Sequence, residues 1–180
     1  MDILDVINNR RSVRSYCNNS ISDDKIKEIL HYGTLAPSAK NKQPWIFVVI
    51  KEDQKLKNKI VDLMIEKSDQ VEKFDPTVVA TANTIKQAPI LVLVFNKFRE
   101  YHLVSNTLSI GACIENMLLT ATNYNIGSLW IRNTDIIEDE ICKMLNKEDM
   151  TLASAVALGI ANEDPIARPR LKIEEITEWK

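Results

Sequence analysis

The amino-acid sequence predicts a single α+β domain, and three features of its pattern support this prediction. Continuous apolar runs of strand length alternate with stretches that have apolar residues at helical spacing, and glycine or proline marks many of the boundaries. The chain has 180 residues, of which 45% are hydrophobic, enough for one sizeable core. We therefore expect residues 1–180 to form one domain, in which helices are interspersed with four strands.

Helix and strand signals follow one another through the first half of the chain. Asp2 and Ser22 are favourable N-cap residues, and each precedes a stretch with helical periodicity. Gly33 follows the second stretch, so we expect it to end that helix at the C′ position. The aromatic and β-branched run 45–50 predicts a strand that is buried on both faces. The predicted elements are helices over 2–9, 22–33 and 54–73, a looser helical segment up to 87, a polar loop over 36–44 and a strand over 45–50.

The second half of the chain continues the alternation. The apolar run 90–95 follows Pro89 and predicts a second strand. A long helix over 103–125 is apolar over much of its circumference, which is typical of a central helix or of an oligomer interface. Segment 64–87 is long enough to serve as a lid. The remaining predicted elements are strands over 127–131 and 151–160, a helix over 135–145 and a tail over 162–180 that wraps over a surface.

Composition and charge exclude several classes of function. The formal net charge of −2 argues against general nucleic-acid binding, and no apolar run approaches the roughly 18 residues of a membrane span. The first residues lack the basic and apolar regions of a signal peptide, so we expect a cytoplasmic protein. Cys17, Cys113 and Cys142 are widely spaced, which fits reduced thiols. His31 and His102 have no cysteine or carboxylate at ligand spacing, so we expect no metal site.

The densest cluster of charged and hydroxyl side chains is Arg10-Arg11-Ser12-Val13-Arg14-Ser15-Tyr16, which we call the arginine segment. Its three guanidinium groups suit a phosphate, because each is a planar fork of donors that is permanently charged. A backbone phosphate cradle is excluded, since the four glycines form neither a P-loop nor a G-x-G-x-x-G turn. The alternative interpretation is a solvated face whose charges complement a helix end.

Four parts of the chain, in order, resemble motifs of the nitroreductase family of FMN-dependent oxidoreductases. The arginine segment resembles the opening R-R-S-x-R-x-[YF] of that family, and residues 36–45 resemble its A-P-S-x-x-N-x-Q-P-W loop. The long helix followed by Gly127-Ser128-Leu129-Trp130 resembles its central dimer helix and the flavin-contacting turn after it. Leu158-Gly159 and Arg168-Pro169-Arg170 resemble its closing strand and phosphate-binding tail. The resemblance spans essentially the whole chain.

The resemblance implies a fold, an assembly and an activity. The fold is a nitroreductase-like α/β/α sandwich with a mixed, mainly antiparallel central sheet, a long central dimerisation helix and a C-terminal tail that wraps the partner subunit. The assembly is a homodimer that binds two FMN molecules at the subunit interface. The activity is transfer of a hydride from NADPH or NADH, through the flavin, to nitroaromatic, quinone or related acceptors, in two half-reactions at one site.

The same resemblance implies roles for individual residues. Arg10 and Ser12 would bind the FMN phosphate, with Arg170 closing on it from the tail. Arg14 would lie near the pyrimidine edge of the flavin, where a cation favours the reduced anion. Glu115 departs from the pattern, because many relatives carry glutamine there. The other implied contacts are Arg11 and Arg168 beside these cations, Pro37, Ser38, Ala39 and Asn41 from the other subunit, the backbone amides around Ser128 and Leu129 near the reactive edge, and the loosely aligned Asn83.

The residues leave other functions open. No Ser-His-Asp, Cys-His or paired-carboxylate arrangement is visible, which suits a flavin enzyme that needs no protein nucleophile. Relatives of the same fold break down the flavin or perform reductive dehalogenation. A flavin-binding module without turnover and a phosphate-ligand binding protein without flavin are the further alternatives.

Overall fold

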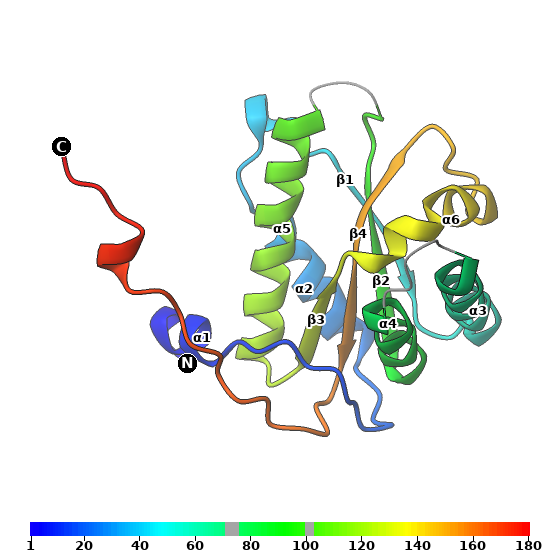
Figure 1. Cartoon of the computed structure of the whole chain (residues 1–180), viewed down its shortest axis with the longest axis horizontal. Coiled ribbons are helices and arrows are strands. Elements are labelled where there is room, and N and C mark those ends of the chain that lie inside the picture. The colour runs from blue at the N-terminus through cyan, green and yellow to red at the C-terminus, as the bar shows by residue number, and fades with distance from the viewer. Residues whose placement is uncertain (71–75, 100–102) are drawn as a thin grey trace.

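The computed structural model describes residues 1–70, 76–99 and 103–180 (Figure 1). Its strands are β1 (Trp45–Ile50), β2 (Ile90–Asn96), β3 (Gly127–Ile131) and β4 (Thr151–Gly159). Its helices are α1 (Ile3–Asn9), α2 (Asp23–Thr34), α3 (Gln54–Gln70), α4 (Pro76–Gln87), α5 (Leu103–Asn123) and α6 (Glu138–Met144). Short 3₁₀ turns are present at Ala39–Asn41, Asn133–Ile137 and Ile173–Glu175.

A four-stranded sheet in the order β1-β2-β4-β3 forms the centre of the domain (Figure 1). The predicted α+β class and the four predicted strands are confirmed. Each pair of neighbouring strands is antiparallel. An isolated parallel bridge joins Ser12 to Ser128, so the arginine segment lies alongside β3.

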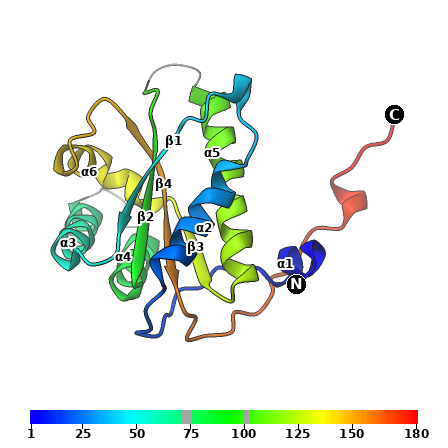
Figure 2. The same ribbon diagram turned by 180° about the vertical axis from the view of Figure 1, so that it is seen from behind.

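Helices cover both faces of the sheet and give the domain three layers (Figures 1 and 2). α2 and α5 pack on one face, whereas α3, α4 and α6 pack on the other. Leu91 and Leu93 of β2 belong to the core under α3 and α4, and Val92 and Val94 belong to the core under α5. The apolar run of β2 is continuous because both of its faces are buried. Among the described residues, no helix is both long and apolar enough to cross a bilayer.

The prediction that residues 45–50 are buried on both faces is wrong. β1 lies at the edge of the sheet, with β2 as its neighbour. Trp45 and Ile50 are buried as expected, but Val49 is 37% exposed. A local pattern of residues does not distinguish an edge strand from a central one, because long-range pairing sets the order of strands in a sheet.

Gly33 does not end α2 as predicted. It lies inside the helix, and a Cβ at this position would lie 2.6 Å from Cγ of Met117. The missing side chain therefore lets α2 and α5 pack closely. Asn125, by contrast, does end a helix. It follows α5 with a φ of 55°, and the N–H of Ile126 donates to the carbonyl oxygen of Ala121 at 2.8 Å.

The described parts of the candidate lid segment 64–87 belong to the core. Residues 64–70 are the end of α3 and residues 76–87 form α4, and the two helices pack against each other. Met64 and Ala82 are fully buried between them and the sheet. Residues 71–75, in the middle of the segment, lie outside the described residues.

Candidate functional site

The arginine segment runs along the ends of β3 and β4. The N–H of Val13 donates to the carbonyl oxygen of Ser128 at 2.9 Å. The N–H of Cys17 donates to the carbonyl oxygen of Ile160 at 2.8 Å. These two backbone hydrogen bonds tie the middle of the segment, and the residue that follows it, to the end of the sheet.

Buried side chains hold the arginine segment in place. Val13 and Tyr16 are buried, and the Tyr16 hydroxyl donates to the carbonyl oxygen of Val13 at 2.8 Å. Burial raises the pKa of Tyr16, so its hydroxyl stays protonated and able to donate at neutral pH. Gly159 leaves room for the ring, because a Cβ there would lie 2.6 Å from Cδ1 of Tyr16. The sheet therefore presents the polar side chains of the segment at defined positions.

Arg10 and Arg11 have different surroundings although they are neighbours. Nε of Arg10 lies 3.6 Å from Oε1 of Glu115 on α5, in a partly exposed ion pair. Nη1 of Arg11 donates to the carbonyl oxygens of Asn8 and Arg10 at 2.7 and 2.9 Å. Arg11 therefore complements the C-terminal end of α1, as the alternative interpretation of the arginine segment holds.

The donors around Arg10 suit a phosphate. Nη1 of Arg14 donates to the carbonyl oxygen of Ser12 at 3.1 Å, which places this second guanidinium close to the Ser12 residue. Oγ of Ser128 is buried without a hydrogen-bond partner among the described residues, and an unsatisfied buried hydroxyl is costly unless a ligand or water meets it. Leu129 is buried next to it. The guanidinium of Arg10 and the hydroxyl of Ser12 fit the charge and the acceptor oxygens of a phosphate monoester, and Arg14 adds a second cation to the same segment.

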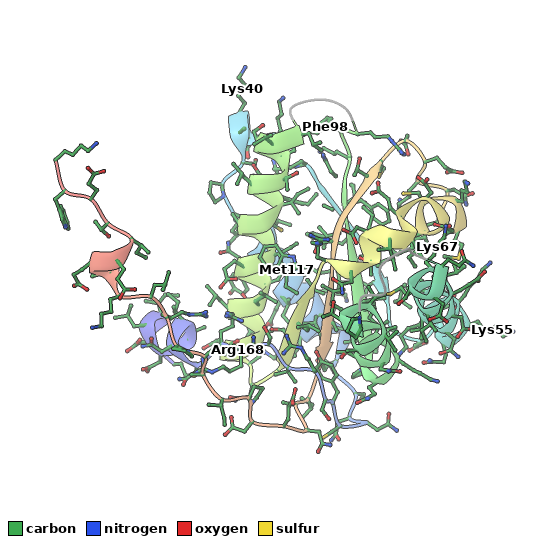
Figure 3. The ribbon with its side chains drawn as sticks, in the orientation of Figure 1. Lys40, Lys55, Lys67, Phe98, Met117 and Arg168 are labelled. Atoms are coloured by element: carbon green, nitrogen blue, oxygen red, sulfur yellow. The ribbon has the colours of Figure 1, made fainter. Side chains whose placement is uncertain are left out.

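The loop over 36–44 lies at the other end of α5 (Figure 1), and Lys40 projects from it in Figure 3. Lys40, Asn41 and Gln43 have φ values of 55°, 52° and 47°, in the left-handed region that residues other than glycine rarely adopt. Oγ of Ser38 accepts the N–H of Gln43 at 3.0 Å and closes the turn. Such backbone conformations are concentrated at ligand sites. The predicted contact residues of this loop are Pro37, Ser38, Ala39 and Asn41.

A single chain does not bring the arginine segment and this loop together. α5 has 21 residues and is therefore about 30 Å long. The loop contacts the start of α5, whereas Arg10 pairs with Glu115 in its second half (Figures 1 and 2). Between these two positions α5 exposes Val104 and Leu108, which are 75% and 71% accessible.

Trp130 ends the motif Gly127-Ser128-Leu129-Trp130 and had no predicted role of its own, but its surroundings make it a candidate site residue. It lies two residues after Ser128 on β3, so both side chains point to the same face of the sheet. Nε1 of Trp130 donates to Oγ of Ser154 at 2.7 Å, and this hydroxyl donates to the carbonyl oxygen of Ile131. Its Cη2 lies 3.5 Å from the position of a Cβ on Gly111 of α5. The half-exposed indole is thus a fixed, flat apolar surface near Ser128.

The tail extends away from the domain (Figures 1 and 2). Ile166 and Trp179 are 91% and 90% exposed, so the tail does not cover the surface of its own protomer. Figure 3 places Arg168 where the tail passes α1. Both Arg168 and Arg170 are exposed, and neither forms a hydrogen bond or an ion pair with the described residues.

Glu163 connects the beginning of the tail to the arginine segment. Its Oε1 accepts the N–H of Ser15 at 3.0 Å and also accepts the N–H of Arg14. Two successive amides that point at one carboxylate form an anion-binding concavity. The N–H of Asn162 donates to the carbonyl oxygen of Ser15 at 2.9 Å and strengthens the same junction. No pattern in the sequence signals this contact, because its partners are almost 150 residues apart.

The remaining candidates lie elsewhere. Asn83 is exposed on α4, which covers the face of the sheet opposite to α5 (Figures 1 and 2). His102 lies outside the described residues. Within the described ranges, no three histidine, cysteine, aspartate or glutamate side chains come close enough to hold a metal ion. Cys17, Cys113 and Cys142 are free thiols.

Known proteins resemble this chain over most of its length. A provisionally named NADH dehydrogenase/NAD(P)H nitroreductase from Archaeoglobus fulgidus is 30% identical over 168 residues, which are 91% of this chain and 87% of that protein. An iodotyrosine deiodinase from Hydra vulgaris is 32% identical over 150 residues, which are 68% of this chain and 55% of that protein.

A solved structure and a family model extend these similarities to the fold. The structure of a provisionally named nitroreductase from Desulfovibrio desulfuricans, in complex with FMN, has a TM-score of 0.81 and 25% identity, and the match covers 100% of this chain and 97% of that one. A model described as the Nitroreductase family matches residues 7–160. This match spans the arginine segment, the loop over 36–44, α5 and the whole sheet. The chain therefore belongs to the nitroreductase family.

Proposed function

We propose that two copies of this chain form an FMN-dependent oxidoreductase, which uses NADPH or NADH to reduce nitroaromatic, quinone or related acceptors. Family membership and the FMN in the Desulfovibrio structure support the cofactor. The name of the Archaeoglobus relative supports a nicotinamide donor. FMN supplies the hydride chemistry when it is bound, so the tasks of the protein are to bind the cofactor, orient it and leave one face open.

The observation that carries this proposal is the location of the arginine segment and the loop over 36–44, the two candidate binding segments, at opposite ends of α5. Antiparallel pairing of α5 with its counterpart in a second copy brings the loop of one chain beside the arginine segment of the other. Val104 and Leu108 become buried in this pairing, and the burial of apolar surface provides a driving force for it. Each dimer then has two equivalent sites, and both chains contribute to each.

The residues of each site have separate tasks. Arg10 and Ser12 hold the phosphate, and Arg170 closes on it from the tail. The backbone amides around Ser128 and Leu129 lie near the reactive edge of the flavin. Arg14 lies near the pyrimidine edge and stabilises negative charge there. The partner contributes its loop, with Pro37, Ser38, Ala39 and Asn41.

The visible spectrum of the purified protein, reconstituted with FMN where needed, is the first test. We expect flavin absorbance that bleaches when NADPH or NADH is added without oxygen, and that returns on addition of a quinone or a nitroaromatic. A protein that stays colourless after reconstitution contradicts the proposal. Bound FMN that neither nicotinamide reduces identifies a binding module without turnover.

Mixed dimers test whether each site is shared between chains. Arg10→Met and Asn41→Ala each alter both sites of a homodimer. A mixed dimer of the two variants has one doubly altered site and one unaltered site, provided that the sites are shared. We expect such dimers to bind one FMN at concentrations that leave both parents empty. Mixed dimers that bind no better than the parents contradict a shared site.

Reductive dehalogenation is a second candidate, favoured by the 32% identity to the Hydra deiodinase. The chain spans about half the length of that relative, so its whole activity does not transfer directly. Release of iodide from iodotyrosine by the FMN-loaded protein with a chemical reductant tests this candidate. A third candidate activity is breakdown of the flavin itself. It predicts loss of FMN under oxygen, which product analysis tests.

A further inference from the structure

A second polar cavity lies outside the residues assigned to the flavin. It has a volume of about 390 Å³ and is formed by the segment before α2, the start of α3 and the end of α4. Its lining includes three lysines, Lys51, Lys57 and Lys86, but a single carboxylate, Glu52. None of the residues that we propose to contact FMN lines it. Its size is at the lower end for pockets that bind small molecules.

Lys57 is the unusual member of this lining, because its side chain is buried. The residue is 4% exposed, and Nζ donates to the carbonyl oxygen of Ala88 at 2.7 Å. An ammonium group has three N–H donors, and no acid is paired with this one among the described residues. Burial lowers the pKa of Lys57, which reflects the cost of keeping its charge away from water. A nearby anion would relieve that cost.

Capping of α4 explains one part of this arrangement. Ala88 follows the last turn of α4, where carbonyl groups give a helix a partial negative charge, and the Lys57 ammonium complements it. This contact uses one donor of Lys57. It does not account for Lys86, which is exposed on the cavity and forms no ion pair with the described residues. It does not account for Lys51 either, whose acidic partner is Asp23 on α2.

Neutral donors add to the positive charge of the cavity. Asn18 and Asn19 line it, and their side-chain amides have no hydrogen-bond partner among the described residues. An amide donates two hydrogen bonds, so these side chains are able to complete the coordination of several acceptor oxygens. Lysine binds phosphate as a compact point charge, which tolerates many orientations of the anion.

We propose that this cavity is a second anion site, which binds a small molecule through its phosphate group by means of Lys57 and Lys86, with Asn18 and Asn19 as neutral donors. The site is independent of FMN, because no residue is shared between the two. The proposed ligand is a small phosphorylated molecule, and this proposal does not depend on the roles that we propose for the flavin site.

Thermal unfolding and calorimetry with inorganic phosphate test this site in protein saturated with FMN, so that the flavin phosphate site is already filled. Potassium chloride at equal ionic strength controls for general screening. We expect phosphate to raise the unfolding temperature in a saturable way, and Lys86→Gln to weaken the apparent affinity about tenfold through loss of one charge-assisted contact. Lys57→Met is expected to weaken it at least as much.

Lys55→Gln is the matched control, because Lys55 is an exposed lysine of α3 that does not line the cavity and projects outward in Figure 3. We expect it to bind phosphate like the unaltered protein. If Lys57→Met fails to fold, the exposed Lys86 variant decides the test. Absence of a saturable response in the millimolar range, or an equal response of Lys86→Gln and Lys55→Gln, overturns the proposal. A response to malonate without a response to phosphate also overturns it and points to a dicarboxylate ligand.

Discussion

The arginine segment and the tail both carry arginines that we propose to grip one phosphate, yet the protomer holds them in very different ways. The buried side chains of Val13 and Tyr16 anchor the arginine segment to the sheet, and backbone hydrogen bonds of Val13 and Cys17 hold its second half in place. The tail leaves the domain with Ile166 and Trp179 almost fully exposed. One half of the proposed phosphate site is thus built when a single protomer folds, whereas the other half has no packing surface on that protomer.

This difference has an energetic consequence. A cation that is already in place when the ligand arrives loses little conformational entropy, whereas an extended segment has to be ordered during binding or association. Arg10 is therefore expected to contribute more to FMN affinity than Arg170. The contribution of Arg170 is also expected to depend on protein concentration, because in the proposed dimer the tail becomes ordered on the surface of the second copy.

Arg10→Met is expected to have the largest effect. The substitution removes a guanidinium from the proposed phosphate site, and we expect the dissociation constant of FMN to rise about 100-fold. Titration of FMN fluorescence measures the change. Arg11→Met is the matched control, because the Nη1 of Arg11 is engaged by carbonyl oxygens at the end of α1. A loss of affinity for Arg11→Met as large as that for Arg10→Met contradicts the different roles of the two arginines.

Arg170→Met is expected to raise the dissociation constant of FMN about tenfold at protein concentrations that maintain the dimer. The effect is smaller because ordering of the tail offsets part of the favourable contact. Titrations at several protein concentrations, with sedimentation velocity on the same samples, separate FMN binding from association. The same titration of Arg168→Met measures how much the neighbouring cation contributes to FMN affinity. If Arg170→Met matches Arg10→Met at every concentration, the tail is as well ordered as the arginine segment and the comparison fails.

Glu163→Gln tests the junction between the two regions. The carboxylate accepts the amides of Arg14 and Ser15, and glutamine retains an oxygen acceptor but loses the charge. We expect a lower unfolding temperature and a dissociation constant of FMN that is about fivefold higher, because charge-assisted hydrogen bonds are stronger than neutral ones. Glu178→Gln, which removes an exposed carboxylate near the end of the tail, is the control and should change neither quantity.

The sequence predicted much of the fold because its signals are local. Helical periodicity and apolar runs gave the positions of the helices and of all four strands, and Asn125 marked the end of α5. The errors concern long-range packing. The order of the strands places 45–50 at an edge, and the contact of Gly33 with Met117 depends on how two helices meet in space.

The candidate site was predictable to a smaller extent, for the same reason. The arginine segment and the loop over 36–44 are contiguous motifs and were recognised from their residues. The left-handed conformations of that loop were not, because lysine and glutamine do not signal positive φ and asparagine signals it less strongly than glycine does. Glu163 acts through partners almost 150 residues away, so local patterns contain no sign of it. Trp130 belongs to a recognised motif, but its contact with Ser154 depends on the pairing of two strands.

Glu115→Gln has the smallest expected effect, but it separates the two regions most directly. Glu115 forms a partly exposed ion pair with Arg10, and such pairs contribute little to stability. Its charge does, however, compete with a phosphate for Arg10 and repel it. We therefore expect Glu115→Gln to lower the dissociation constant of FMN about threefold, with a smaller difference at high salt because screening weakens both effects. When Glu115→Gln is combined with Arg10→Met, the gain in FMN affinity should disappear, because the two residues are in contact and their effects couple. When it is combined with Arg170→Met, the same gain in affinity should persist, because the two effects are independent. An equal gain in FMN affinity in both double variants would show that the Glu115 charge repels the phosphate directly, rather than by competing for Arg10.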